Sequence, residues 1–227
     1  MCRIDHITVT APTLERGAEF VFSSLGIRPQ PGGTHPRMGT HNLLLRLGEN
    51  VFLEVIAIDP HAPRPTRPRW FALDERPVDA EPCLAMWVAR TDDIETASAA
   101  IPEDLGAIET MTRGALQWTI TIPADGSLPF GGIGPALIEW DTSVHPAAGM
   151  QDQGCRLRRL EIFHPEPERV ARLLGQMGLP ENIDALALPV GARPYLVAEI
   201  DTPSGRRSIG APPAPGLQGP GSLHRGR

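Results

Sequence analysis

The residue types and spacing between Asn50 and Asp59 single out Glu54, a carboxylate in the middle of an apolar, β-branched run long enough for one strand. A strand of this composition is covered by protein on part of both faces, and a buried, unpaired carboxylate costs several kcal/mol or takes up a proton. Glu54 therefore needs a metal ion, an arginine or a hydrogen-bonding substrate as its partner. Glu139 lies in the apolar run from Ala136 to Trp140 and therefore also needs a partner. For both carboxylates the structural alternative to a functional role is an ion pair with arginine.

Histidine and short polar side chains lie close to the predicted strands. His6 lies on the strand pattern from Ile4 to Val9, where the alternative is a polar residue that is only hydrogen-bonded. His35 could act as an acid or base near neutral pH. Thr40 and Asn42 begin the next strand and could orient an oxygenated ligand, whereas the alternative is turn chemistry supported by the neighbouring glycines.

An arginine and several aromatic side chains form a third candidate group. Arg113 precedes a predicted strand that carries Trp118, and Trp140 lies on a later strand. An arginine among aromatic side chains suits a carboxylate or enediolate ligand, through bidentate hydrogen bonds and stacking. The alternative is that the tryptophans belong to the core and that Arg113 pairs with Glu139.

Composition and missing motifs exclude several classes of function. The net charge of -6 argues against nucleic acid as the main partner. No apolar run approaches the roughly 20 residues of a membrane span, and the N-terminus has no signal-peptide core, which predicts a cytoplasmic protein without a membrane partner. The 3 cysteines include no Cys-x-x-Cys pair. Dinucleotide-binding, phosphate-loop and serine-hydrolase motifs are also missing, so nucleotide-dependent and serine-hydrolase chemistry is unsupported.

A recurring order of elements must position these side chains. A strand, a helix and two further strands occupy residues 4–58, the same order returns in residues 84–140, and it begins a third time at Leu157. We therefore predict an α+β fold in which repeated βαβββ-type units form a curled mixed sheet around a pocket. The expected divisions are a first unit with a Pro/Arg-rich connection at 1–78, a second unit at 79–150, a partial third unit at 151–210 and a flexible tail at 211–227.

The connection after the first unit holds several prolines together with Arg67, Arg69 and Trp70. These three side chains could close over the pocket. The alternative is a solvated surface loop.

The order of elements, the opening Ile4-Asp5-His6-Ile7 and the run from Phe52 to Ile56 resemble the vicinal oxygen chelate superfamily. That superfamily includes glyoxalase I, extradiol dioxygenases and fosfomycin- and bleomycin-resistance proteins. A narrower resemblance is to the bacterial glyoxalase-like domain proteins. It is carried by Gly33-Thr34-His35, Gly39-Thr40-His41-Asn42, Arg113, Gln117-Trp118 and the stretch from Pro135 to Asp141 with His145-Pro146.

The resemblance implies a metal site with one ligand from the first strand and one from the last strand of each of two units. The matching positions hold His6, Glu54 and Glu139, while the fourth falls on Met86, a poor ligand for hard or borderline ions. One histidine and two carboxylates would suit a divalent ion such as Fe(II), Mn(II) or Zn(II), with open positions for a substrate.

The function implied by the resemblance is a glyoxalase/dioxygenase-type enzyme acting on a small substrate with two neighbouring oxygens. Lyase or isomerase chemistry is favoured over oxygen insertion, because the second unit offers no second histidine, and Glu54 and His35 are the expected acid–base residues. The competing hypotheses are a metal-free protein that binds or sequesters a small aromatic or anionic compound, and an interaction domain with a vestigial pocket. Since members of the superfamily often pair units across a dimer, a homodimer is the expected assembly.

Overall fold

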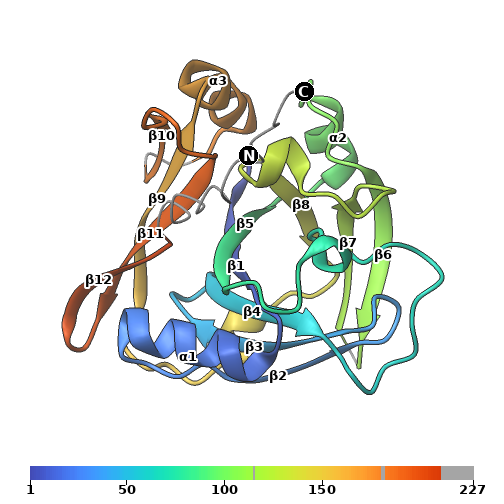
Figure 1. Cartoon of the computed structure of the whole chain (residues 1–227). Helices are drawn as coiled ribbons and strands as arrows, with labels where there is room; N and C mark the ends of the chain where they lie inside the picture. The colour runs from blue at the N-terminus through green and yellow to red at the C-terminus, as the bar shows by residue number, and fades with distance from the viewer. Residues whose placement is uncertain (115, 180–181, 211–227) are drawn as a thin grey trace, which may run out of the picture.

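The computed structural model describes residues 1–114, 116–179 and 182–210, in which twelve strands form an eight-stranded and a four-stranded sheet (Figure 1). The predicted tail at 211–227 lies outside the described residues. The first unit contains β1 (Arg3–Thr10), α1 (Leu14–Leu25), β2 (Gln30–His35), β3 (Thr40–Arg46) and β4 (Phe52–Ile58). The second contains β5 (Cys83–Arg90), α2 (Ile94–Ala99), β6 (Ala107–Arg113), β7 (Leu116–Ile122) and β8 (Pro135–Trp140).

The two units combine into one sheet with the strand order β2-β3-β4-β1-β5-β8-β7-β6. In each unit the first strand runs parallel to the last, β1 beside β4 and β5 beside β8, and the antiparallel pair β1–β5 joins the units. The strands curl around a common centre, as Figure 1 shows. The predicted α+β fold with a curled mixed sheet is therefore confirmed.

The curl brings the two edge strands of this sheet together. Arg37, in the turn after β2, donates a hydrogen bond to the carbonyl oxygen of Thr110 on β6 at 2.9 Å and pairs with Glu109. Arg67 from the connection also binds Glu109, at 2.6 Å. These contacts hold the open side of the sheet nearly closed, so the concave face becomes an interior.

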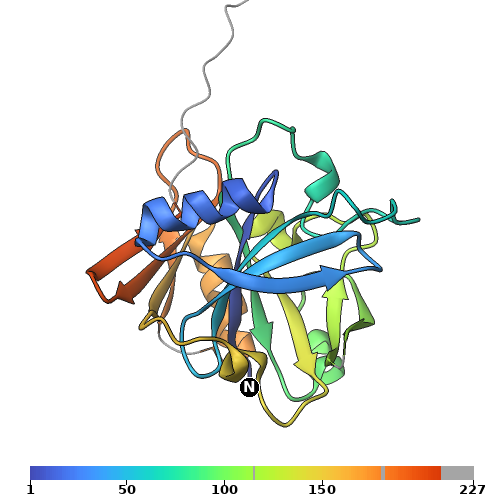
Figure 2. The same cartoon turned by 90° about the horizontal axis from the view of Figure 1, so that it is seen from below.

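Alternation along β1 separates the two faces of the sheet. Ile7 and Val9 face the core between the sheet, α1 and the second sheet, whereas His6 and Thr8 face the concave interior. Helix α1 begins where the Thr13 hydroxyl accepts a hydrogen bond from a backbone N–H and ends at Gly26, whose φ of 74° suits glycine. Figure 2 shows α1 lying across both sheets, where it packs against β3, β4 and β12.

The remaining described chain forms the second sheet from β9 (Arg156–His164), α3 (Pro167–Met177), β10 (Ile183–Ala187), β11 (Tyr195–Thr202) and β12 (Gly205–Ile209). It repeats the order of elements, but its strands pair as β10-β9-β11-β12, so β9 runs parallel to β10 instead of to the last strand. The division of the chain at 78, 150 and 210 stays a prediction. None of the helices in the described residues has the length and apolarity that crossing a membrane requires.

Candidate functional site

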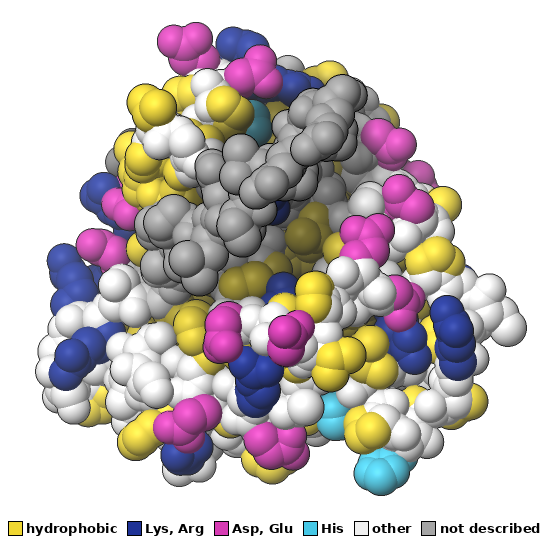
Figure 3. All heavy atoms as spheres, viewed as in Figure 1, with side chains coloured by type: hydrophobic (Ala, Val, Ile, Leu, Met, Phe, Trp, Pro, Cys, Tyr) yellow, Lys and Arg dark blue, Asp and Glu magenta, His cyan; other side chains and the backbone are white. Residues whose placement is uncertain are grey.

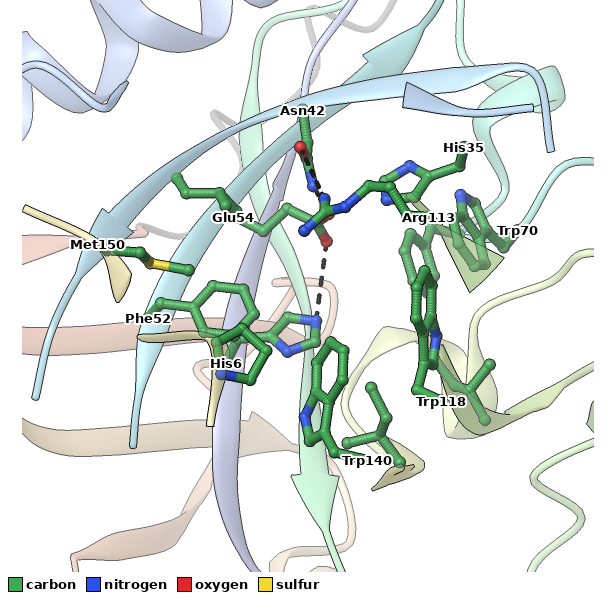
Figure 4. Close-up of a pocket in the computed structure, with 15 residues that line it drawn as sticks. His6, His35, Asn42, Phe52, Glu54, Trp70, Arg113, Trp118, Trp140 and Met150 are labelled. Carbon is green, nitrogen blue, oxygen red and sulfur yellow. Dashed lines mark hydrogen bonds and ion pairs between the residues drawn. The ribbon is translucent and has the colours of Figure 1, made fainter. Parts of the chain in front are cut away.

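A pocket on the concave face of the eight-stranded sheet collects most of the predicted site residues (Figure 4). Side chains from seven strands, β1 to β4 and β6 to β8, point into it, and the chain segment around Trp70 and Phe71 covers it. The space open to water-sized molecules is about 40 Å³, enough for very few waters. The predicted residues that the structure brings together here are His6, His35, Asn42, Glu54, Arg113, Trp118 and Trp140.

Asn42 links the carboxylate of Glu54 to the guanidinium of Arg113. Its side-chain nitrogen donates to Glu54 Oε1 at 2.6 Å. Its side-chain oxygen accepts from the backbone N–H of Gly33 at 2.8 Å and from Arg113 at 3.3 Å. These partners fix the amide orientation, because only the nitrogen can donate. Oε1 of Glu54 is thereby occupied, and Oε2 faces His6.

His6 has one ring nitrogen engaged and one available. Nδ1 lies 2.6 Å from Oδ1 of Asp5, and since an ionised carboxylate only accepts, Nδ1 carries the proton. Nε2 lies 3.7 Å from Glu54 Oε2, and the ring stacks on Phe52 with centroids 4.5 Å apart. Neighbours on a regular strand point to opposite faces; the register shift between Ile4 and His6 explains how Asp5 and His6 can meet.

Asp5 is the central buried charge that sequence reasoning missed. It is fully buried and accepts hydrogen bonds from His6, from His145 Nε2 at 2.8 Å and from Trp140 Nε1 at 2.8 Å. His145 Nδ1 accepts from the backbone N–H of Ala147 at 3.1 Å, which leaves Nε2 as the donor to Asp5. Burial alone would raise the pKa of Asp5, but the hydrogen bonds and charges of His145 and His6 hold it well below its usual range.

Aromatic side chains make up much of the remaining wall. Trp118 and Trp140 lie with ring centroids 5.4 Å apart, and Trp70 stacks on Phe71 at 5.1 Å. Trp70 thus closes over the pocket, as one reading of the connection predicted. Arg69 does not reach the pocket and instead binds Asp74 at 2.6 Å, next to the covering segment.

His35 and Thr40 form a supporting pair at the edge of the pocket. The Thr40 hydroxyl lies 3.1 Å from His35 Nδ1 and does not itself line the pocket. Burial lowers the pKa of His35 to about 4; Arg113 adds to the shift and Glu54 opposes it. The imidazole is therefore neutral near pH 7, where it suits a hydrogen-bonding role better than that of a base.

The lowered pKa of His35 predicts a loss of stability in mild acid. Below about pH 6.5 the His35 imidazole binds a proton in the unfolded chain, but in the folded chain it does so only near pH 4. The free energy of unfolding should therefore fall by about 3 kcal/mol over this range. Urea unfolding of wild type and His35→Gln at several pH values measures the effect. The stability of wild type relative to His35→Gln should fall by about 3 kcal/mol between pH 6.5 and pH 4, while His41→Gln, on the other face of β3, should follow the pH dependence of wild type. Parallel pH profiles for wild type and His35→Gln would show this expectation to be wrong.

Gly32 and Gly33 of β2 provide room for the pocket side chains. A Cβ on Gly32 would lie 2.1 Å from the Asn42 side-chain oxygen, and one on Gly33 would lie 2.9 Å from Cδ of Arg113. Neither glycine has a positive φ, so the requirement is close approach and not the turn conformation considered from sequence.

Substitution Gly33→Ala should therefore displace Arg113 and weaken the binding of a small carboxylate such as 2-oxobutanoate about tenfold, through loss of a charge-assisted hydrogen bond. Tryptophan fluorescence titration measures this affinity. Gly175→Ala is the matched control, because nothing lies within 4 Å of its Cβ position. An unchanged affinity in Gly33→Ala would argue that Arg113 does not hold the carboxylate.

Glu139 is the predicted metal ligand that the structure places elsewhere. Its Oε2 accepts a hydrogen bond from the backbone N–H of Ile94 at 2.8 Å, at the start of α2. Neighbours on a strand point to opposite faces, so the inward position of Trp140 turns Glu139 away from His6 and Glu54. The alternative pairing of Glu139 with Arg113 does not occur either, since Arg113 binds Asn42.

A family model and one solved structure agree with this fold. The family model described as a glyoxalase-like domain matches residues 4–178. A crystal structure of a hypothetical protein from Staphylococcus aureus has a TM-score of 0.55 at 15% identity, covering 92% of this chain and 86% of that chain, and this likeness shows the fold alone. A methylmalonyl-CoA epimerase in complex with methylmalonyl-CoA and NH4+ gives a TM-score of 0.42 at 15% identity, covering 64% of this chain and 99% of that chain. No curated protein matches the sequence.

Proposed function

The chain belongs to the glyoxalase-like domain family of the vicinal oxygen chelate superfamily, and on this basis we propose that it is a small-molecule enzyme of lyase or isomerase type. The proposed substrate carries two neighbouring oxygens, one of them anionic, and an exchangeable proton on a carbon beside a carbonyl group. The supporting observation is the meeting of Arg113, Glu54 and His6 in one buried pocket. These groups offer a cation for the oxygens and acceptors for the proton.

Arg113 would bind the oxygens of the substrate. Among the described residues its guanidinium donates one hydrogen bond, to Asn42, although arginine carries five N–H donors. The free donors match a carboxylate or enediolate, and the developing negative charge on an enediolate would strengthen these bonds. Arg113 thus favours the intermediate over the neutral carbonyl form.

Glu54 would act as the base. Asn42 holds Oε1 at 2.6 Å, so the carboxylate keeps a fixed orientation with Oε2 open toward His6 and the pocket. A positioned base of this kind contributes about 10²- to 10⁴-fold to a proton transfer. His6, whose Nδ1–H is held by Asp5, can then accept the proton from Glu54 at Nε2 or donate it to a substrate oxygen.

The divalent ion implied by the superfamily finds an incomplete set of ligands in this chain. His6 Nε2 and Glu54 Oε2, 3.7 Å apart, are the two donors that face each other. No cluster of three or more His, Cys, Asp or Glu side chains suited to a metal occurs within residues 1–114, 116–179 and 182–210. Catalytic zinc sites use three protein ligands, so the residues present do not fit a tightly held ion, and the chemistry above depends on the side chains alone.

A metal-free binding protein is the second candidate function, favoured by the aromatic wall of the pocket. Deuterium uptake separates the two. Wild type is incubated in D₂O with EDTA and with 2-oxobutanoate or 2-hydroxybutanoate, and proton NMR follows the hydrogen on the carbon beside the carbonyl or carboxylate group. Enzyme-catalysed exchange supports the proposal; quenching of tryptophan fluorescence by these compounds without exchange supports the binding protein. A homodimer stays a prediction, which light scattering on the eluted protein tests.

A further inference from the structure

A second and larger hollow lies between the two sheets, separated from the pocket by Phe71. The hollow has a volume of about 710 Å³, against about 40 Å³ for the pocket, and Phe71 lines both. We propose that the two form one binding site for an elongated molecule, with an oxygenated anionic head at Arg113 and an apolar tail of several carbons in the hollow. This proposal rests on the proposed function and adds the class of substrate.

The walls of the hollow suit an apolar tail. They include Phe20 of α1, Leu84 and Ala85 of β5, Leu128, and Tyr195 of β11. Figure 3 shows hydrophobic side chains at the bottom of a hollow near the centre of this face. A volume of about 710 Å³ lies within the range of roughly 300 to 1,000 Å³ that is usual for small-molecule sites, whereas the pocket alone can hold only very small molecules.

The partition between the two spaces is a strained segment. Phe71 and Ala72 are not glycines, yet they have φ values of 60° and 51°, a backbone conformation that costs about 1 kcal/mol or more per residue. The strain is held in place by a hydrogen bond of 2.7 Å from the Ala72 N–H to the Gly126 carbonyl and by the Arg69–Asp74 pair. Release of this strain would favour movement of Phe71, which would join the two spaces.

Two buried polar atoms without partners lie along the same route. Along β1, Thr8 stands between His6, which lines the pocket, and Thr10, which lines the hollow, although Thr8 itself lines neither space. Among the described residues the Thr8 hydroxyl and the Trp70 indole N–H have no hydrogen-bond partner. An unpaired buried polar atom is costly, and a water held beside the bound molecule would satisfy these groups.

A chain-length series of carboxylates tests the proposal on the full chain. Dissociation constants of butanoate, hexanoate, octanoate and decanoate are measured by tryptophan fluorescence and calorimetry. Affinity should rise at least about 100-fold from butanoate to decanoate, because each methylene buried in the hollow tightens binding. Arg113→Gln should weaken binding at every length, since it removes the partner of the shared carboxylate.

Variants that fill the hollow locate the tail. Ala85→Trp, and Ala80→Trp as an independent second choice, add bulk to walls of the hollow that do not line the pocket. Each variant that folds should bind butanoate with the affinity of wild type. It should not show the increase in affinity from butanoate to decanoate.

Three results would overturn the proposal. Affinity that does not depend on chain length, with butanoate still sensitive to Arg113→Gln, rejects the elongated ligand and leaves the proposed function intact. A gain with length whose decanoate affinity is not weakened by Arg113→Gln rejects the joining of the two spaces. A gain that persists in both tryptophan variants places the tail elsewhere. Failure of the proposed function itself is recognised separately, by the lack of deuterium exchange.

Discussion

Replacing Glu54 by glutamine is expected to lower the rate of deuterium exchange into the substrate by about 10²- to 10⁴-fold, the contribution of a positioned general base. Glutamine has nearly the shape of glutamate and can still accept a hydrogen bond from Asn42, so the pocket should keep its geometry. It cannot take up the proton. The exchange rate is measured by proton NMR in D₂O with EDTA present.

Glu19→Gln is the matched control, because Glu19 is an exposed residue that pairs with Arg28 on the surface. It should exchange protons at the wild-type rate. Ligand affinity in Glu54→Gln should stay within a few fold of wild type, which separates a lost base from a lost binding site. Exchange at the wild-type rate in Glu54→Gln would mean that Glu54 is not the base.

Removing the buried carboxylate in Asp5→Ala is expected to lower the free energy of unfolding by about 3 to 5 kcal/mol. The substitution leaves three donors without an acceptor, those of the buried His6 and His145 and of the half-buried Trp140. Urea unfolding followed by circular dichroism measures the loss. Asp152→Ala removes an exposed ion pair with Arg156 and should change the stability little. A similar small change in Asp5→Ala would show that the buried network does not stabilise the fold.

Asp5 should also make the protein sensitive to strong acid. Its folded-state pKa lies below that of the unfolded chain, so its contribution is complete above about pH 5 and is lost as the pH falls below about 4. Wild type and Asp5→Ala should therefore converge in stability toward low pH. A constant difference between them from pH 5 to pH 2 would contradict the pKa shift.

The apolar strand around Glu54 indicated that its carboxylate needs a partner, because a buried polar group requires one. The family resemblance, which places ligands on the first and last strands of a unit, named His6 beside it. The first and last strands of a unit then lie side by side, β1 beside β4, which brings the two residues together. The same alternation could have excluded Glu139. Trp140 was also predicted for the pocket, and two neighbours on a regular strand cannot both face it.

Other features depend on the folded chain. The sequence of β2, Gln-Pro-Gly-Gly-Thr-His, predicted a turn, because proline and glycine are depleted in strands. The strand lies at the edge of the sheet, where proline and glycine are tolerated. Asp5 is hydrogen-bonded to His145, which is 140 positions away in the sequence. It also lies beside a register shift in the pairing of β1 with β5, which the residue pattern of the strand does not predict. The feature of the sequence that could have pointed to Asp5 was a carboxylate directly before the histidine of the first strand.

The contacts of Phe71 were equally hidden. Its positive φ is held by the hydrogen bond from the neighbouring Ala72 N–H to the carbonyl of Gly126, which is distant in the sequence. Its position between the pocket and the hollow results from the packing of the second sheet against the first. Residue propensities contain neither fact. Such long-range contacts determine the volume of the pocket, which the sequence does not reveal.

A crystal structure of the full chain grown with 2-oxobutanoate and EDTA tests the central claim most directly. The account predicts that the carboxylate oxygens accept hydrogen bonds from Arg113 and that the proton-bearing carbon lies within reach of Glu54 Oε2. Anomalous difference density for a metal ion between His6 and Glu54, or a ligand bound away from Arg113, would contradict it.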